Sequence, residues 1–316
     1  MTSRRLAVLA IGGNALIRDH AHESIPDQYR MVCDFAVDIA DMIDAGWNVV
    51  VTHGNGPQIG FILRRSELAM KEVPPIPMDC AGGDIQGAVG YLFVKALRNE
   101  FHRRGIARAA VAIVTQTIVD RNDPAFADPT KPIGSHMEEA HAKKLAARFH
   151  WTVREDAGRG WRRVVPSPRP KAIVEAGVIG FLAHAGYVVV ACGGGGIPVI
   201  EDERGDLVGV EAVIDKDFAS GLLAHRMGAD TLVLPTGVEK VALDFNKPTQ
   251  RWLDRLTLAE ARKYQEEDQF AKGSMGPKIA AVIDFLEYGG RMGLITDQPN
   301  IARALRGETG TRIVAE

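Results

Sequence analysis

The sequence lacks the features of a membrane protein or a disulfide-bonded protein. No stretch reaches the roughly 18 consecutive apolar residues that a membrane-spanning helix needs. The cysteines, Cys33, Cys80 and Cys192, are odd in number and form no Cys-x-x-Cys pair, which argues against a disulfide framework. The apolar run after the two N-terminal arginines is short and meets Gly-Gly-Asn instead of a cleavage site for a signal peptide. We therefore expect a cytoplasmic protein with buried, reduced cysteines.

Several catalytic signatures are also missing. No Gly-Lys dipeptide occurs, which excludes a P-loop, and there is no His-Glu-x-x-His metal motif. The nine histidines show no ligand spacing, and no Ser, Cys or His nucleophile has an evident partner base, which disfavours a phosphoenzyme. The net charge of −2 excludes a generally nucleic-acid-binding chain. Any site for an anion must therefore be built from a local cluster of cations.

Strand-like and helical patterns alternate along most of the 316 residues. The strand-like runs are 6–11, 48–53, 107–120, 187–192, 231–235 and 291–296, and the helical patterns are 27–46, 86–105, 171–186, 217–228 and 277–290. Such alternation is typical of α/β proteins with an open, mostly parallel sheet covered by helices on both faces. The length allows one large α/β unit or two lobes.

Residues 121–170 break this alternation. The segment is rich in Pro, Gly, Arg and Trp, with a charged helical stretch at 138–150. A long solvated loop is one interpretation, but excursions of this length within a compact domain are usually functional or form a small subdomain. Trp151 and Trp161 favour a protruding subdomain with packing of its own.

Three of the predicted strands end in glycine-rich turns, at 11–15 (IGGNA), 53–60 (HGNGPQIG) and 192–198 (CGGGGIP). Ligands of open α/β sheets lie outside the carboxyl ends of parallel strands, where glycines let backbone N–H groups approach an anion. One such turn is explained by a tight turn alone, but three in one sheet predict a shared anion site. None of them matches Gly-x-Gly-x-x-Gly, which disfavours an NAD-dependent dehydrogenase.

Three lysines occupy unusual positions. Lys216 lies between Asp215 and Asp217 where an apolar run meets a helix; an exposed ion pair worth less than about 1 kcal/mol is the simpler interpretation. Lys278 enters the first turn of a helix, where the helix dipole disfavours a cation unless an anion is bound. Lys131 stands between two prolines that stiffen its loop. Phosphoryl transfer requires alignment, Mg²⁺ and positive charge on the transferred group, which three such lysines would supply.

These stretches together resemble carbamate kinase, a member of the amino acid kinase superfamily. The matching segments are IGGNAL, HGNGPQIG, DPAFADPTKPIG, GRGWRRVVPSP, ACGGGGIPV, GVEAVIDKDFAS, GVEKV and GSMGPKI, and the match runs from about Leu6 to the TGTRIV near the C-terminus. The resemblance implies a three-layer α/β/α sandwich that is usually a homodimer. It further implies reversible phosphoryl transfer between ATP and carbamate with Mg²⁺ held by the nucleotide phosphates and water, used in arginine catabolism to make ATP from carbamoyl phosphate.

The resemblance also implies roles for individual residues. Lys216 and Lys278 would act on the transferred phosphoryl group, Asp217 would orient them, and Lys131 would reach in from the subdomain. The residues around carbamate and its phosphate would be Gly12, Gly13, Asn14, Gly54, Asn55, Gly56, Gly193, Gly194, Gly195 and Gly196. Those along the nucleotide would be Asp215, Thr236, Val238, Glu239, Val241, Ala271, Gly273, Met275 and Gly276. No residue of the chain is expected to bind a metal directly.

The same resemblance predicts how the chain is divided. Residues 1–316 would form a single domain, in which 1–210 mainly bind the acceptor and 211–316 mainly bind the nucleotide. The protruding subdomain, 121–170, would be inserted in the first half.

The chain departs from the family pattern at two positions. Ile85 stands where the family usually has a small hydroxyl residue, and Gly237 stands where it usually has an acidic or amide residue. Two alternatives stay open: a kinase of the same fold for another small carboxylate-like acceptor, and a non-catalytic sensor of nucleotide or carbamoyl phosphate. The three intact lysines argue against the sensor.

Overall fold

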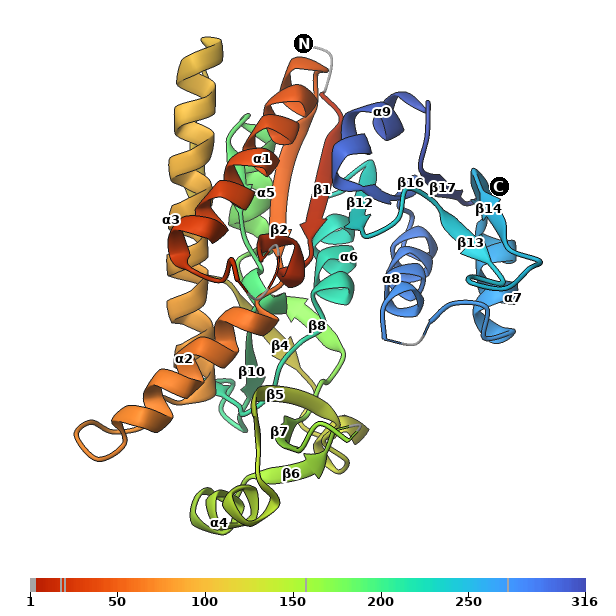
Figure 1. Ribbon diagram of the computed structural model, residues 1–316. Helices are drawn as coiled ribbons and strands as arrows, with labels where there is room; N and C mark the ends of the chain where they lie inside the picture. Colours follow the sequence, from red (N-terminus) through yellow and green to blue (C-terminus); the bar gives the residue numbers. More distant parts are fainter. Residues whose placement is uncertain (1–3, 18, 20, 157, 272) are drawn as a thin grey trace.

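The computed structural model describes residues 4–17, 19, 21–156, 158–271 and 273–316. In these segments the largest element is an eight-stranded sheet (Figure 1). Its strands, in order across the sheet, are β15 (Arg255–Thr257), β17 (Thr311–Val314), β16 (Met292–Asp297), β12 (Thr231–Thr236), β1 (Leu6–Ile11), β2 (Asn48–His53), β9 (Val188–Val190) and β3 (Ala110–Ala112). Neighbouring strands are parallel, except that β16 and β17 are antiparallel. The predicted open, mostly parallel sheet is confirmed.

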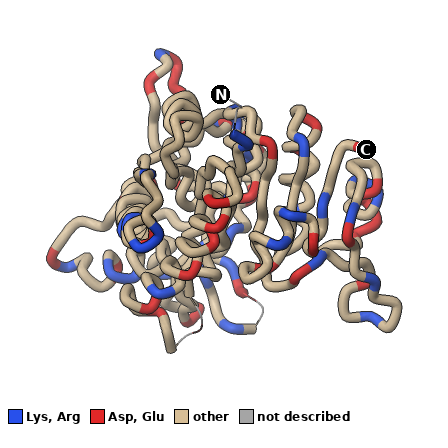
Figure 2. The backbone as a smooth tube through the Cα atoms, turned by 90° about the horizontal axis from the view of Figure 1, so that it is seen from above, with Lys and Arg blue, Asp and Glu red and all other residues tan. Residues whose placement is uncertain are grey.

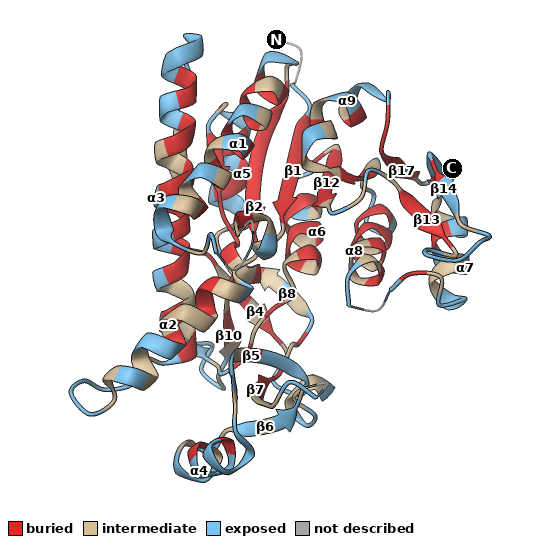
Figure 3. Ribbon diagram, viewed as in Figure 1, coloured by how far each residue is buried: buried red, intermediate tan, exposed pale blue. Residues whose placement is uncertain are grey.

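Helices cover both faces of this sheet and bury its strands (Figure 3). One face packs against α1 (Ile25–Asp44), α3 (Met78–Arg104) and α9 (Ile301–Arg306), and the other against α5 (Ala176–His184), α6 (Lys216–Arg226), α7 (Leu258–Glu266) and α8 (Met275–Glu287). Because successive side chains of a strand point to opposite faces, Leu9 packs on the first side and Val8 on the second. The α/β/α sandwich is confirmed. None of the helices in the described segments is apolar over a length that could span a membrane. Of the three cysteines expected to be buried, Cys192 is buried, but Cys33 is only half-buried and Cys80 is exposed, so that expectation was wrong for two of them.

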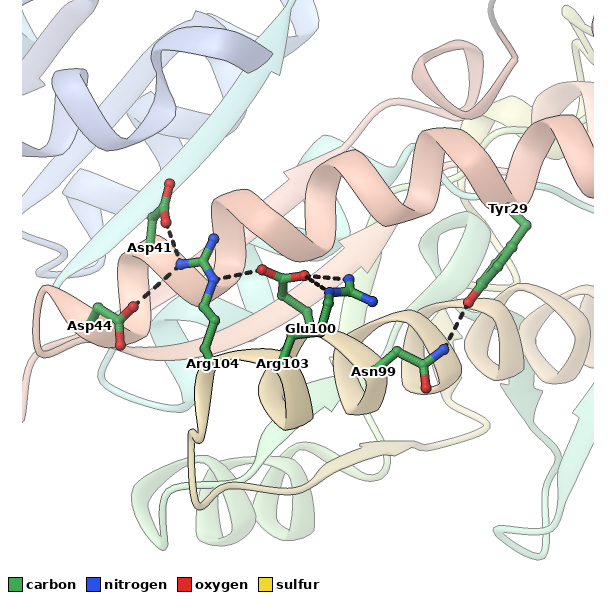
Figure 4. Close-up of polar contacts among 7 residues, drawn as sticks. All are labelled: Tyr29, Asp41, Asp44, Asn99, Glu100, Arg103 and Arg104. Carbon is green, nitrogen blue, oxygen red and sulfur yellow. Dashed lines mark hydrogen bonds and ion pairs between the residues drawn. The ribbon is translucent and has the colours of Figure 1, made fainter.

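A polar network fastens α1 to α3 on the first face (Figure 4). At the end of α3, the Arg104 guanidinium donates to Asp41 and Asp44 of α1 and to Glu100 one turn earlier. The hydrogen bond to Asp41 raises the pKa of Arg104, so the side chain is a permanent cation. Helix α3 ends at Gly105, which has a φ of 68° as an αL cap. Its start is eight residues earlier than the 86–105 pattern indicated.

Two of the predicted elements were wrong in extent. The run 107–120 is not one buried strand, because β3 joins the central sheet whereas β4 (Gln116–Val119) joins a second sheet. The turn between them is held by the Thr115 hydroxyl, which accepts from the Cys192 N–H. The run 171–186 is likewise divided into β8 (Pro170–Ile173) and α5. The order of the second sheet is β11 (Leu207–Gly209), β10 (Ile197–Glu201), β4 and β8.

Part of residues 121–170 extends below the second sheet in Figure 1. It contains β5 (Lys131–Met137), α4 (Glu139–Phe149), β6 (Thr152–Glu155) and β7 (Trp161–Val165), and its three strands pair in antiparallel fashion. Trp151 stacks on Phe149 with ring centroids 5.3 Å apart, and the Arg163 guanidinium lies 4.4 Å from the Trp151 ring centroid. Helix α2 (Gly56–Ala69) contacts β5 and joins this part to the body. Elsewhere, β13 (Val241–Leu243) and β14 (Arg251–Leu253) form a hairpin.

Charged residues are interspersed over the molecule. In Figure 2, Lys and Arg positions alternate with Asp and Glu positions around the backbone. Exposed pairs such as Lys143 with Glu139 and Lys171 with Asp120 join them, and each such pair contributes about 0–1 kcal/mol. These exposed pairs therefore contribute little to stability. Charged groups interact more strongly where they are buried, as some lysines of the chain are.

Candidate active site

A cleft of about 790 Å³ opens at the carboxyl ends of the parallel strands. Because β1, β2, β9 and β12 are parallel, the turns that follow them meet at one edge of the sheet. The predicted site residues that line the cleft are Gly12, Gly13, Asn14, Gly54, Asn55, Gly56, Lys131, Gly194, Asp215, Lys216, Asp217, Thr236, Gly273 and Lys278. The structure thus brings all three lysines and all three glycine turns together.

The turns after β1 and β2 pack backbone against backbone. A Cβ atom on Gly54 would lie 2.5 Å from the Gly13 nitrogen, and one on Gly13 would lie 3.0 Å from the Asn55 nitrogen. The Gly54 N–H also donates to the Ile11 carbonyl at 2.8 Å. Any side chain at Gly13 or Gly54 would push the two turns apart, so the narrow backbone-lined end of the cleft depends on both glycines.

The four consecutive glycines after β9 divide into two groups. Gly194 lines the cleft at a φ of 67°, and its Cβ would lie 2.1 Å from the Asn55 Nδ2. The other three do not line the cleft. Instead, their Cβ atoms would clash with His53 (Gly193), the Ile214 carbonyl (Gly195) and Thr117 (Gly196). Close packing accounts for these three glycines, and Gly194 is the one that a ligand in the cleft could touch.

A buried charge cluster forms the floor of the cleft. Asp215 caps α6 by accepting the Asp217 N–H at 2.9 Å, which holds the first turn of the helix. The Lys216 Nζ donates to Asp217 and, at 3.0 Å, to the Ala10 carbonyl of β1. The Lys278 Nζ, from the first turn of α8, donates to the other oxygen of Asp217 at 3.1 Å. The three side chains are only 8–12% exposed, so one carboxylate holds two ammonium groups side by side.

Burial and charge act against each other in this cluster. Burial lowers the pKa of Lys216, with Asp217 opposing the shift. Burial alone would raise the pKa of Asp217, but Lys216 and Lys278 outweigh it and hold that pKa below its usual range. Asp217 is therefore ionised at neutral pH, and the cluster carries an excess of positive charge that a bound anion would relieve.

The third lysine reaches the cleft from β5. The Lys131 Nζ lies 3.7 Å from an Asp215 carboxylate oxygen, and its side chain is 47% exposed. This looser contact leaves the Lys131 ammonium largely hydrated, in contrast to the two buried lysines. The segment that carries it is thus in position to bring a third cation over the cleft.

His53 lies behind the glycine turns and adds no charge. Its side chain is buried and its Nδ1 lies 3.0 Å from the Gly54 carbonyl. Burial lowers the pKa of His53 to about 4, so the imidazole is neutral at physiological pH. It supports the turns by packing, stacked on Phe93.

Six of the predicted nucleotide residues do not line the cleft: Val238, Glu239, Val241, Ala271, Met275 and Gly276. The Val241 N–H donates to the Thr311 hydroxyl, and Glu239 accepts from Thr309. These contacts join the hairpin to the end of the chain. Lys272, which falls within the predicted stretch from Ala271 to Lys278, lies outside the described residues.

The two departures from the family pattern differ in position. Ile85 is 1% exposed in the core between α3 and the sheet, and it does not line the cleft. Its neighbour Gln86 forms two hydrogen bonds with the Thr115 backbone. Gly237 does line the cleft, and no atom lies within 4 Å of a Cβ built on it. The substitution at Ile85 is therefore absorbed by packing, whereas the one at Gly237 leaves open space at the site.

Sequence reasoning missed the end of β16. Asp297, the last residue of this strand, and Gln298 and Pro299, which follow it, line the cleft. The carboxyl-end rule that selected the glycine turns applies equally to β16, so the Asp after the strand-like run 291–296 was the available signal. Asp297 is the register partner of Thr236 on the neighbouring β12.

The carboxylates of the cleft are poorly arranged to enclose a metal. Among the described residues, no three His, Cys, Asp or Glu side chains converge as a metal site. Both oxygens of Asp217 accept from lysines, and Asp215 is engaged by the Asp217 N–H and Lys131. A Mg²⁺ ion in the cleft would therefore have to take most of its oxygen ligands from water and from the group that it accompanies.

Comparison with known proteins agrees with this geometry. The sequence profile of the amino acid kinase family matches residues 5–297, and the chain belongs to that family. A carbamate kinase of Thermococcus kodakarensis is 48% identical over 312 residues, covering 98% of this chain and 99% of that protein. The carbamate kinase-like protein YahI of Escherichia coli is 48% identical over 314 residues, covering 98% and 99%.

A solved structure gives the same result. Carbamate kinase from Giardia lamblia bound to AMP-PNP has a TM-score of 0.94 and 40% identity, with 99% of both chains covered. Within the amino acid kinase family, the resemblance to carbamate kinase is confirmed over the full length of the chain.

Proposed function

We propose that this chain catalyses the reversible reaction ATP + carbamate = ADP + carbamoyl phosphate. The observation that carries the proposal is the buried Lys216–Asp217–Lys278 cluster facing the backbone of the glycine turns. The full-length relatives named carbamate kinase support this choice of acceptor. In the cell, we propose that the enzyme makes ATP from carbamoyl phosphate, in the cytoplasm and as part of arginine catabolism.

The order of strands suggests how the substrates are arranged. Across the carboxyl edge the order is β9, β2, β1, β12, β16. The glycine turns follow β9, β2 and β1, and their backbone N–H groups would bind the small acceptor. We therefore propose that residues 1–210 mainly bind the acceptor and that residues 211–316 mainly bind the nucleotide. Thr236 and Gly273 lie toward the β12 side of the cleft, where the nucleotide would be bound.

The lysines act on the group in transfer. When carbamoyl phosphate donates to ADP, the P–O bond to the carbamate oxygen breaks and a P–O bond to the terminal ADP oxygen forms, while negative charge is spread over the phosphoryl oxygens. Lys216 and Lys278 would each donate to these oxygens, and Asp217 would keep both ammonium groups in place. Preorganised donors of this kind need no reorientation as the charge develops.

Two further groups complete the proposed site. Lys131 would approach from the protruding segment 121–170 and exclude water from the substrates. Mg²⁺ bound to the nucleotide phosphates would neutralise part of their charge. The residues of the chain would bind the metal through those phosphates and water.

The proposal is tested by incubating the protein with ADP, Mg²⁺ and carbamoyl phosphate and measuring ATP. Acetyl phosphate serves as the competing donor. ATP formed from carbamoyl phosphate in clear preference to acetyl phosphate supports the proposal. Preference for acetyl phosphate would assign the site to another small carboxylate acceptor. Nucleotide binding with no ATP from either donor, at millimolar concentrations, would assign the protein as a sensor.

We also propose that the protein is a homodimer formed through the β3 edge of the central sheet. β3 is the last strand in the sheet order, and an edge strand offers its free backbone groups to another chain. Val114 (53% exposed) follows β3, and α5, which packs on β2 and β9, exposes Val178 (58%) and Phe181 (74%). Exposed apolar side chains near a sheet edge favour burial against a second copy.

A further inference from the structure

The end of the cleft farthest from the glycine turns is formed by β12 and β16. These strands follow β1 in the sheet order, and their last residues, Thr236 and Asp297, are register partners. Lys216 contacts the β1 carbonyl of Ala10, so the cations stand between the glycine turns and this end. Thr236, Asp297 and Gln298 give it a polar lining.

The position of the sugar follows from that of the phosphates, given the proposed function. The nucleotide phosphates must reach Lys216 and Lys278, since these are the buried cations of the described cleft. The turns of Gly13 and Gly54 stand on the β2 side of these lysines, where the proposed function places the small acceptor. A ribose attached to those phosphates must therefore lie on the opposite side, over the ends of β12 and β16.

Asp297 differs from the other carboxylates of the cleft. One of its oxygens accepts from the Asn300 Nδ2 at 2.7 Å, and within the described residues the other makes no hydrogen bond. Asp215 and Asp217, in contrast, are engaged by lysines. Asp297 is thus the carboxylate that keeps an acceptor available for a ligand.

The charge of Asp297 restricts what that ligand group is. A carboxylate repels phosphate oxygens, and when ionised it accepts hydrogen bonds but donates none. Neighbouring hydroxyl groups on a sugar are the matching donors, and hydrogen bonds to an ionised acceptor are the stronger kind. Gly237, which follows Thr236 at the end of β12, contributes no side chain, and no atom lies within 4 Å of a Cβ built on it. We propose that Asp297 binds the ribose 2′- and 3′-hydroxyls and makes the site selective for ribonucleotides.

The test compares ADP with 2′-deoxy-ADP and 3′-deoxy-ADP by calorimetric titration of the full chain without carbamoyl phosphate. Wild type should bind ADP about tenfold or more tightly than one or both deoxy analogues, because the charged hydrogen bond is lost. In Asp297→Ala this preference should fall to about twofold or less. Asp206→Ala, in the exposed turn between β10 and β11, should keep the wild-type preference.

The outcomes separate this inference from the proposed function. If the variant keeps the full preference for ADP, or weakens ADP and both analogues by equal factors, Asp297 supports the loop through Asn300 and the inference is wrong. If the variant instead loses the Mg²⁺ dependence of ADP binding, Asp297 binds the metal and the inference is again wrong. A wild type that does not bind ADP at all contradicts the proposed function itself. Melting temperatures of the variants show whether they fold.

Discussion

Asp217 holds two ammonium groups in a space that water barely reaches. Burying one carboxylate with two cations leaves the empty site with unbalanced positive charge, and burial already lowers the pKa of Lys216. Desolvating charge is costly unless the charge is compensated. In the proposed reaction a phosphoryl group would supply that compensation, most strongly in the transition state, when negative charge is spread over its oxygens. The two lysines would then stabilise the transition state more than they stabilise the bound substrates, and this difference would lower the activation barrier.

At this scale we predict the effect of removing one ammonium group. Lys216→Ala should lower kcat about 10²–10³-fold, by analogy with the loss of one transition-state donor at about 3–4 kcal/mol. The fold should survive, because Lys278 still pairs with Asp217 and the capping contact of Asp215 remains. Initial rates of ATP formation from ADP and carbamoyl phosphate measure the effect.

The matched control for this variant is Lys171→Ala, which removes an exposed lysine paired with Asp120. Its kcat should equal that of the wild type within about twofold. A Lys216→Ala protein that melts like the wild type and turns over at nearly the same rate would remove Lys216 from the mechanism.

Helix α1 connects the core to the far end of the cleft. Arg104 holds its C-terminal part through Asp41 and Asp44 (Figure 4). About one turn earlier in the same helix, Asp38 accepts a hydrogen bond from Gln298, which lines the cleft. Burial raises the pKa of Asp38 to about 7, with Gln298 opposing the shift and Asp41 and Asp34 adding to it. This element therefore contains a carboxyl group that is neutral in mild acid and charged in mild base.

The raised pKa of Asp38 predicts a loss of stability with increasing pH. The folded protein keeps a proton on Asp38 up to about pH 7, whereas the unfolded chain releases it near pH 4, so the free energy of unfolding falls between these values. Asp38→Asn cannot ionise. Its stability advantage over the wild type should therefore grow by about 1–3 kcal/mol between pH 5 and pH 8.

Urea unfolding at the two pH values measures this difference. Asp206→Asn, on an exposed turn, should follow the wild type at both. If Asp38→Asn shows the same change in stability between the two pH values as the wild type, Asp38 does not titrate in the folded state.

The eight-stranded sheet ends in β15 on one side and in β3 on the other. At one end, β15 is short and followed directly by α7. At the other end is β3, and α5, which packs on the neighbouring β9 and on β2, exposes the apolar Val178 and Phe181. Pairing two copies at β3 would cover these side chains and extend the sheet. The cleft, at the carboxyl edge of the strands, would stay open.

The homodimer proposal predicts that Phe181→Asp favours the monomer. Placing a charge at the centre of an apolar interface should weaken association about 30-fold or more, the range of interface hot spots. Sedimentation equilibrium over a range of protein concentrations measures the dissociation constant. Phe245→Asp is the control, since Phe245 is 49% exposed on the segment between β13 and β14 and should leave the constant unchanged. A wild type that is monomeric throughout the range would contradict the proposal.

The sequence by itself determined the features that depend on neighbouring residues. The alternation of strands and helices and the turn at each strand end are local, and they indicated a parallel sheet with a shared anion site. Lys216, Lys278 and Lys131 were found in the same way, since each stands in a conspicuous local setting. The family resemblance joined these pieces into one chemistry.

Only the tertiary structure decided what depends on partners distant in the chain. Membership of a sheet divided 107–120 between two sheets. Packing placed Ile85 in the core and left Gly194 as the glycine of its turn that lines the cleft. The register of β12 with β16 brought Asp297 to the site. Strand order and register arise from contacts between segments up to hundreds of residues apart, and a pattern read along one segment contains no information about them.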